Sequence, residues 1–291
     1  MSIFNFSDIS KSEEVIQRTW EDFRSALAGG AFLYNQLDVA KANTTFLKVF
    51  DDLFSHCHRF FDVSAKSVLS LPTTLVRAGR LCSDDSEPTY NRFVPNKDYI
   101  TNHNRFSPPG VEWLYLAIGD LRIAENCALR ECRAMKGERF GLCQFKLNEK
   151  YSEKMLVDLT IAEDVLYEDL NMWFENSADE IRTREINKAV SSIICKGYAQ
   201  DPDVSDFKNK FTKWAAYTYA RLLSKQIFIP VETADKKFIY LPFQCIAQYF
   251  LSLGYEGVVY SSTVFPKGKN VVLFDKDAAI PTGKIKTLCI Y

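Results

Sequence analysis

The chain has 291 residues, of which 47% are hydrophobic, 14% aromatic and 25% charged, a profile that indicates a folded globular protein and excludes a disordered one. With 36 basic and 37 acidic residues the formal net charge is -1, so the sequence does not support a broad basic surface for nucleic acid. It contains no run of about 18 apolar residues, so we expect no membrane association.

Two further features predict a cytoplasmic protein. The first residues, MSIFNFSDISKSEE, lack the cationic start and apolar core of a secretory signal. The 8 cysteines are scattered through mostly apolar surroundings, which favours reduced, buried thiols over a disulfide framework.

Residues 1–70 are predicted to form an N-terminal helical region. The segment Ser10-Lys11-Ser12-Glu13 has the form of a capping box, and apolar residues then recur at helical spacing. Two apolar stripes, separated by Gly29-Gly30, consist of Ile16, Trp20 and Phe23, and of Phe46, Phe50, Leu53, Cys57 and Phe60.

Residues 71–291 are predicted to form a second domain built on a sheet. Apolar or alternating runs indicate strands at 73–77, 113–118, 140–145, 155–160, 258–260 and 271–274. A helix follows Asp120, another ends at Gly254, and residues 161–228 are strongly helical, which we interpret as an insertion between strands. The predicted fold class is α+β, with a small mixed sheet and helices at one side and end.

Three polar residues follow one another at intervals of ten on consecutive predicted elements. Arg105 lies in a turn, Tyr115 in an apolar strand and Glu125 on an amphipathic helix. A turn–strand–helix unit folds back on itself, so these side chains can converge on one pocket. On periodicity alone, ordinary roles are the more frequent outcome: a surface arginine, a core tyrosine and a solvated glutamate.

Motifs of several other enzyme classes are missing from the sequence. It contains no GxGxxG, GxxxxGK[ST], HExxH or GxSxG, and only 3 histidines. His56 and His58 alternate on a predicted helix and point about 200° apart, so they do not face one ion. Cys127 and Cys132 lack the spacing of a metal site and are interpreted as core thiols. No metal site is expected.

Three segments, in order, carry a resemblance to a known family. The segments Arg105-Phe-Ser-Pro-Pro-Gly110, Leu114-Tyr-Leu-Ala117 and Ala124-Glu125 match a pattern R[FW]xxxG…LYxA…AxxE, with the last spacing tightened to Ala-Glu. Gln244 and the segment from Gly254 to Ser262 match Q…GxDGIxYxS, with Glu256 in place of the aspartate. The final segment, Asn270-Val-Val-Leu-Phe274, matches NxxLF. Over residues 71–160 and 235–280 the sequence thus resembles the RES domain family, and the helical segments 1–70 and 161–228 depart from its compact form.

The resemblance implies an NAD⁺-consuming, toxin-like enzyme whose fold is similar to that of ADP-ribosyltransferases. Members of the family split the nicotinamide–ribose bond by hydrolysis or phosphorolysis, and some transfer ADP-ribose to a protein. Many are inhibited by an antitoxin with an Xre-type helix-turn-helix domain. NAD⁺ would be the substrate, no further cofactor would be needed, and a homo-oligomer is compatible with the sequence.

The resemblance also implies roles for individual residues. Glu125 would stabilise the cationic transition state, and Arg105 and Arg77 would bind the pyrophosphate. Tyr115 would stack on nicotinamide or bond its ribose.

Three further positions carry supporting roles. Ser262, with Ser261 as the competing choice, would bind the ribose or a phosphate. Gln244 and Asn270 would support the residues that touch NAD⁺.

Two alternatives stay open at this point. One is an ADP-ribosyltransferase that modifies a protein target, and the other is a non-catalytic interaction module. The enzyme interpretation requires that Arg105 and Glu125 share one cleft.

Overall fold

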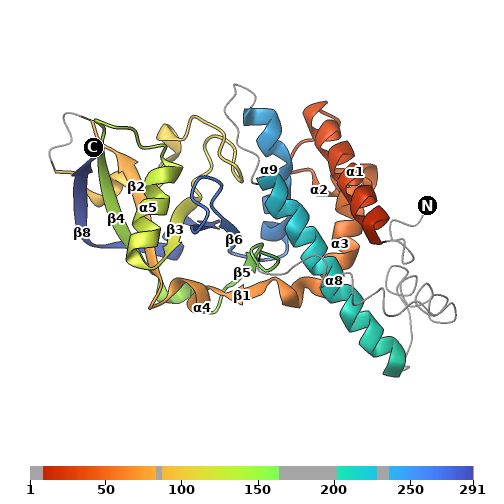
Figure 1. Cartoon of the computed structure of the whole chain (residues 1–291). Helices are drawn as coiled ribbons and strands as arrows, with labels where there is room; N and C mark the ends of the chain where they lie inside the picture. Colours follow the sequence, from red (N-terminus) through yellow and green to blue (C-terminus); the bar gives the residue numbers. More distant parts are fainter. Residues whose placement is uncertain (1–8, 83–86, 164–201, 228–235, 291) are drawn as a thin grey trace. The chain divides into compact units, whose positions relative to one another are not determined.

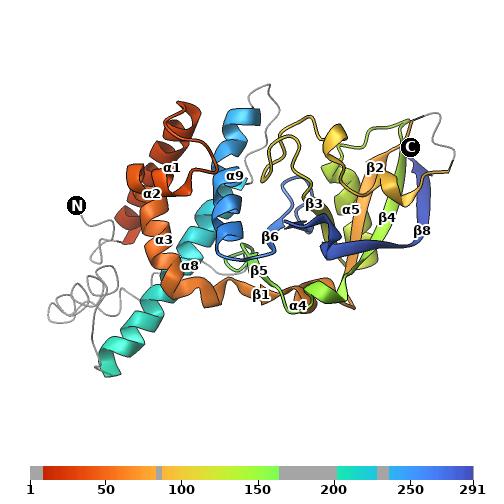
Figure 2. The ribbon, with the colours of Figure 1, turned by 180° about the vertical axis from the view of Figure 1, so that it is seen from behind.

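The computed structural model describes residues 9–82, 87–163, 202–227 and 236–290. The chain divides into two compact units, one of Met1–Phe61 with Ile161–Leu223 and one of Asp62–Thr160 with Ser224–Tyr291. Figures 1 and 2 show the two units from opposite sides. No described helix is both long and apolar enough to cross a membrane.

The first unit is helical in its described part. It contains α1 (Ile9–Ala28), α2 (Leu37–Asn43), α3 (Thr45–Cys57) with the 3₁₀ turn η1 (His58–Phe60), and α8 (Pro202–Ile227) as far as Leu223. The core is aromatic: Tyr219 of α8 contacts Phe46 and Phe50 of α3, with ring centroids 5.8 and 5.3 Å apart. Helix α1 already includes Ser10, so the predicted capping box does not begin this helix.

The second unit contains an eight-stranded sheet in the order β1-β5-β6-β7-β3-β2-β4-β8. Strands β5 and β6 pair in parallel and all other neighbours are antiparallel, so the sheet is mixed. The α+β class predicted from the sequence is confirmed. The strands are β1 (Asp62–Ser64), β2 (Thr74–Arg80), β3 (Leu114–Gly119), β4 (Arg139–Leu147), β5 (Met155–Asp158), β6 (Gly257–Ser261), β7 (Lys269–Leu273) and β8 (Ala279–Cys289).

The boundary between the two kinds of structure differs from the expected one. We expected the helical region to reach residue 70, but Asp62–Ser64 is strand β1 and pairs with β5. The expected helical insertion at 161–228 lies partly outside the described residues, since 164–201 are not among them. Its described part up to Leu223 groups with the first unit.

Helix α5 (Leu121–Glu131) covers one face of the sheet at β2 and β3 (Figure 1). Asp120 caps it by accepting a hydrogen bond from the Ile123 amide, at 2.9 Å. The buried side chains of α5 are small, namely Ala124, Cys127 and Ala128, so the helix can approach Val76 and Ala117 of the strands closely. The opposite face of the sheet packs a larger apolar cluster that includes residues of α4 (Ala65–Leu69).

Strands β2 and β3 pair over only part of their length. Their register joins Thr74–Val76 to Ala117–Gly119 and stops there. Beyond that point β2 continues with β4 as far as Arg80, while β3 continues with β7 as far as Leu114. The sheet therefore opens between the second half of β2 and the first half of β3.

The remaining helix of this unit, α9 (Lys236–Ser252), includes Pro242 and precedes Gly254, whose φ of 86° suits the chain reversal. It leads into β6, which lies between β5 and β7.

We expect Gly257→Ala to destabilise the sheet unit by about 1–3 kcal/mol or more. A Cβ at Gly257 would overlap the backbone carbonyl oxygen of Val272, which belongs to the paired strand β7 and cannot rotate away. Chemical denaturation followed by circular dichroism measures the change. A variant as stable as the wild type would contradict this close approach of β6 and β7.

Candidate functional site

A pocket of about 390 Å³ lies in the sheet unit where β2 and β3 separate. Both strands line it, β2 through Val76–Ala78 and β3 through Tyr115–Ala117. The C-terminal end of α5, the loop before β3 and residues of α9, β6 and β7 complete the wall. The charged or potentially charged groups on the wall are Arg77, His103, Arg105, Glu131 and Arg133.

Several residues proposed from the sequence meet here. Arg77, Arg105, Tyr115 and Asn270 all line the pocket, although they come from different parts of the chain. Ser262 is buried and joins the site by donating a hydrogen bond to Glu131 of the pocket wall.

Glu125 is not among the described residues that line the pocket. Its Oε2 atom accepts a hydrogen bond from Lys286 Nζ of β8, at 2.7 Å. The helix period explains why Glu125 lies away from the pocket. Ala124 and Ala128 face the sheet, and Glu125, one position after Ala124, is turned toward β8. The expectation that Arg105 and Glu125 share one cleft is thereby corrected.

The carboxylate on the pocket wall is Glu131, the last residue of α5. It lies four positions after Cys127 and three after Ala128, so it continues the stripe of α5 that faces the sheet. Sequence reasoning missed it, although two signals were present. One is this stripe, and the other is the segment Ala128-Leu-Arg-Glu131, which fits AxxE without shortening.

One oxygen of Glu131 is held by two donors. Its Oε1 accepts from Ser262 Oγ at 2.8 Å and from Asn270 Nδ2 at 2.7 Å. Within the described part of the chain, Oε2 makes no hydrogen bond. The hydrogen bonds to Oε1 therefore orient the carboxylate, and Oε2 is available to a ligand.

The two donors are themselves oriented. Ser262 Oγ accepts from the amides of Val264 and Phe265, at 3.3 and 3.1 Å, so its hydroxyl proton is left for Glu131. Asn270 Oδ1 accepts from Cys127 Sγ at 3.5 Å, which is consistent with its amide nitrogen facing Glu131. Ser261 is buried on β6 and does not line the pocket.

Arg77 of β2 has a buried donor without a hydrogen-bond partner among the described residues. The Nη1 atom of Arg77 is inaccessible to solvent and has no hydrogen-bond partner among the described residues. Burial lowers the pKa of the Arg77 guanidinium, which remains charged at any physiological pH. A buried, unpartnered cationic donor on a pocket wall is suited to an anionic ligand.

The loop before β3 holds Arg105 over α9. The guanidinium carbon of Arg105 lies 5.6 Å from the ring centroid of Tyr240. Gln244 Nε2 donates to the Asn104 carbonyl oxygen at 3.0 Å and lies 3.2 Å from His103 Nδ1. Gln244 does not line the pocket, and its hydrogen bond to Asn104 instead supports the loop that carries Arg105.

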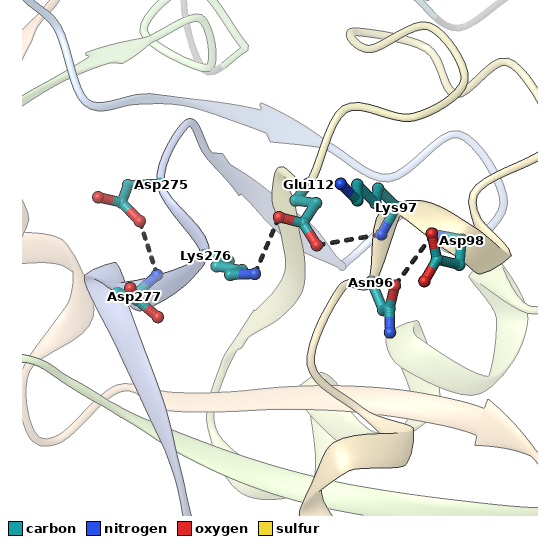
Figure 3. Close-up of polar contacts among 7 residues, drawn as sticks. All are labelled: Asn96, Lys97, Asp98, Glu112, Asp275, Lys276 and Asp277. Atoms are coloured by element: carbon teal, nitrogen blue, oxygen red, sulfur yellow. Dashed lines mark hydrogen bonds and ion pairs between the residues drawn. The ribbon is translucent and has the colours of Figure 1, made fainter.

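Glu112 closes the same loop and ties it to the sheet (Figure 3). Glu112 accepts from the amide of Lys97 at 3.0 Å and from Lys276 Nζ at 2.8 Å, and the Lys276 bond lowers the pKa of Glu112. Lys97 and Lys276 each lie in a local turn. In the first turn Asn96 Oδ1 accepts from the Asp98 amide, and in the second Asp275 Oδ1 accepts from the Asp277 amide. These contacts join residues 96–112 to the turn between β7 and β8.

Two tyrosines supply neutral polar groups. Tyr115 Oη and Ser107 Oγ lie 2.9 Å apart, and burial raises the pKa of Tyr115 far above its usual value. Burial also raises the pKa of Tyr260. Both phenols therefore stay protonated at physiological pH and can donate hydrogen bonds or stack, but they cannot serve as bases.

The wall as a whole favours a ligand with separated charges. Three guanidiniums, of Arg77, Arg105 and Arg133, can bind anionic groups, and the single carboxylate of Glu131 can face a cationic one. Among the described residues, no group of three or more His, Cys, Asp or Glu side chains could hold a metal ion.

Comparisons with known proteins give little support for any function. No family model matches the chain, and no curated protein matches it. Among solved structures, it is similar to a chain in the crystal structure of the M.tuberculosis MbcT-MbcA toxin-antitoxin complex, with 10% identity and a TM-score of 0.29, over 82% of this chain and 92% of that chain. At that TM-score the likeness carries no argument.

Proposed function

We propose that this protein cleaves the nicotinamide–ribose bond of NAD⁺, as a glycohydrolase or phosphorylase of toxin type. The observation that supports this proposal is the placement of Glu131, oriented by Ser262 and Asn270, on the wall of a pocket that also holds Arg77 and Arg105. The site brings together the arginine, glutamate and serine of the RES-like motifs. Glu131 takes the catalytic role that was first assigned to Glu125.

Cleavage of the nicotinamide–ribose bond needs one carboxylate near the ribose, and Glu131 has one oxygen that makes no hydrogen bond to the described residues. The bond between the ribose C1 and the nicotinamide nitrogen breaks, and its electron pair leaves with neutral nicotinamide. Positive charge then develops on the ribose, and Glu131 Oε2 would stabilise it electrostatically or hold a ribose hydroxyl. Water or inorganic phosphate adds to C1 and loses a proton.

The arginines suit the pyrophosphate of NAD⁺. The pyrophosphate carries two negative charges, and a guanidinium binds phosphate oxygens in a bidentate manner. Arg77, whose Nη1 has no partner among the described residues, would gain one, and Arg105 would close over the phosphates from the loop. Tyr115 would stack on nicotinamide or bond its ribose.

A fold of the ADP-ribosyltransferase kind belongs to the same proposal. It is supported by a mixed sheet whose central strands separate to form the pocket. Cytoplasmic action and inhibition by an Xre-type helix-turn-helix antitoxin are proposed on the RES-like motifs alone.

Incubation of the purified chain with NAD⁺ tests the function. Release of nicotinamide is expected, and product analysis with and without phosphate separates ADP-ribose from its phosphorylated form. Radiolabel from NAD⁺ that appears on protein would instead indicate ADP-ribosyl transfer. If the folded protein leaves NAD⁺ intact under all conditions, the enzyme proposal is wrong and a binding module is favoured.

Arg105→Lys is expected to raise KM for NAD⁺ about ten-fold with little change in kcat, because lysine keeps the charge but not the bidentate geometry. Steady-state nicotinamide release measures both constants. Arg122→Lys is the matched control, since Arg122 is exposed on α5 and does not line the pocket. An unchanged KM for Arg105→Lys would remove Arg105 from phosphate binding.

A further inference from the structure

Arg133 has an unusual backbone conformation. Its φ is 50°, and among the described residues it is the one position other than glycine with a positive φ. It directly follows the end of α5 and its C-cap, Cys132. The Arg133 amide donates to the Arg130 carbonyl at 2.9 Å, and the Ala134 amide donates to the Leu129 carbonyl at 3.2 Å. This is the Schellman pattern, in which the left-handed position favours glycine.

The side chain at this strained position lines the pocket. Arg133 is exposed, shares the pocket wall with Arg77 and Arg105, and lies two residues after Glu131. Glycine would make the same turn without strain, so the turn itself does not explain an arginine here. Strained backbone that persists at a pocket is a reason to examine function.

We propose that Arg133 is a substrate-binding residue that contacts the pyrophosphate of the dinucleotide. This inference rests on the proposed function and adds a residue that the sequence motifs do not contain. A cationic nicotinamide ring would be repelled by a guanidinium, so the ligand group at Arg133 is anionic. The C-terminal end of α5 and the turn after it thus present a carboxylate and a guanidinium two residues apart, one for each end of the nicotinamide nucleotide.

Arg133→Gly acts on both the backbone and the guanidinium. Glycine relieves the left-handed strain at this position, so the variant is expected to fold, and its melting temperature shows what the side chain contributes to stability. Loss of the guanidinium is expected to weaken binding of ADP-ribose, which keeps the pyrophosphate, at least about ten-fold. Thermal unfolding and isothermal titration calorimetry measure the two effects on the full chain.

Two further variants sharpen the comparison. Arg130 is exposed in the last turn of α5 and does not line the pocket. Arg130→Ala removes its positive charge, so ADP-ribose affinity should stay at the wild-type value. Arg133→Lys keeps both the strain and the charge, so its melting temperature should match the wild type and its affinity should lie between the wild type and Arg133→Gly.

The outcomes separate this inference from the proposed function. A wild-type protein that binds ADP-ribose but releases no nicotinamide, with affinity lost in Arg133→Gly, supports the inference and contradicts the proposed function. Wild-type affinity in Arg133→Gly overturns the inference, whether or not NAD⁺ is cleaved. Weaker binding in Arg133→Gly that Arg133→Lys does not partly restore also overturns it, because the charge at this position would then not serve the ligand.

Discussion

Glu131→Gln is expected to lower nicotinamide release by about 100- to 1,000-fold while ADP-ribose affinity changes little. Glutamine keeps the size of the side chain, and its amide oxygen can still accept from Ser262 and Asn270. It lacks the negative charge that would stabilise the developing cation. The loss should therefore appear in kcat, with only a small change in KM.

Glu125→Gln is the matched control for this experiment. Glu125 is a glutamate of the same helix, but it pairs with Lys286 and does not line the pocket. We expect it to release nicotinamide at close to the wild-type rate. If Glu131→Gln is active and Glu125→Gln is not, the assignment made from the structure is reversed.

The second large effect is expected for Arg77→Met, which should weaken ADP-ribose binding by roughly 100-fold. Methionine fills similar space without a charge, so the phosphate loses a buried donor. The Nη1 atom of Arg77 has no partner among the described residues, and its removal relieves an uncompensated desolvation cost. The melting temperature should consequently stay the same or rise. Calorimetric titration and thermal unfolding measure both quantities.

Arg80→Met tests whether any arginine of β2 has this effect. Arg80 forms an ion pair with Glu138, at 3.0 Å, and does not line the pocket. Its loss should leave ADP-ribose affinity unchanged. Unchanged affinity in Arg77→Met as well would show that the buried guanidinium serves the fold alone.

The sequence predicted the strands that carry strong apolar signals. Runs such as 113–118 and 271–274 became β3 and β7 at the centre of the sheet, where both faces are covered. Helix α5 was also predicted, because Asp120 and a one-sided stripe mark it. Such central elements are recognisable because burial requires apolar residues at nearly every position.

Elements at the margins of the sheet were not predicted. Strand β8 is an edge strand with mostly exposed side chains, and it contains Pro281, Gly283 and two lysines. Strand β1 is the other edge and has three residues. Neither strand has the alternation of apolar and polar residues that identifies a half-buried strand. Each is an edge strand that is held in the sheet by hydrogen bonds to a single neighbouring strand.

The candidate site was predicted in part. Arg77, Arg105, Tyr115 and Asn270 line the pocket, but the carboxylate was assigned to Glu125 and not to Glu131. Equal spacing along the sequence favoured Glu125, whereas position on the helix surface decides which glutamate faces the strands. Arg133 could not be found from sequence, because its backbone conformation depends on where α5 ends.

The separation of β2 from β3 after Val76 has a consequence for changes in chain length. Arg77 stands between Val76 and Ala78, whose side chains belong to the apolar cluster beneath α5. Because successive side chains of a strand alternate in direction, a deletion or insertion of one residue in β2 would exchange the guanidinium for an aliphatic group. Homologues that keep this pocket should therefore vary in length at their surface connections, and never within this strand.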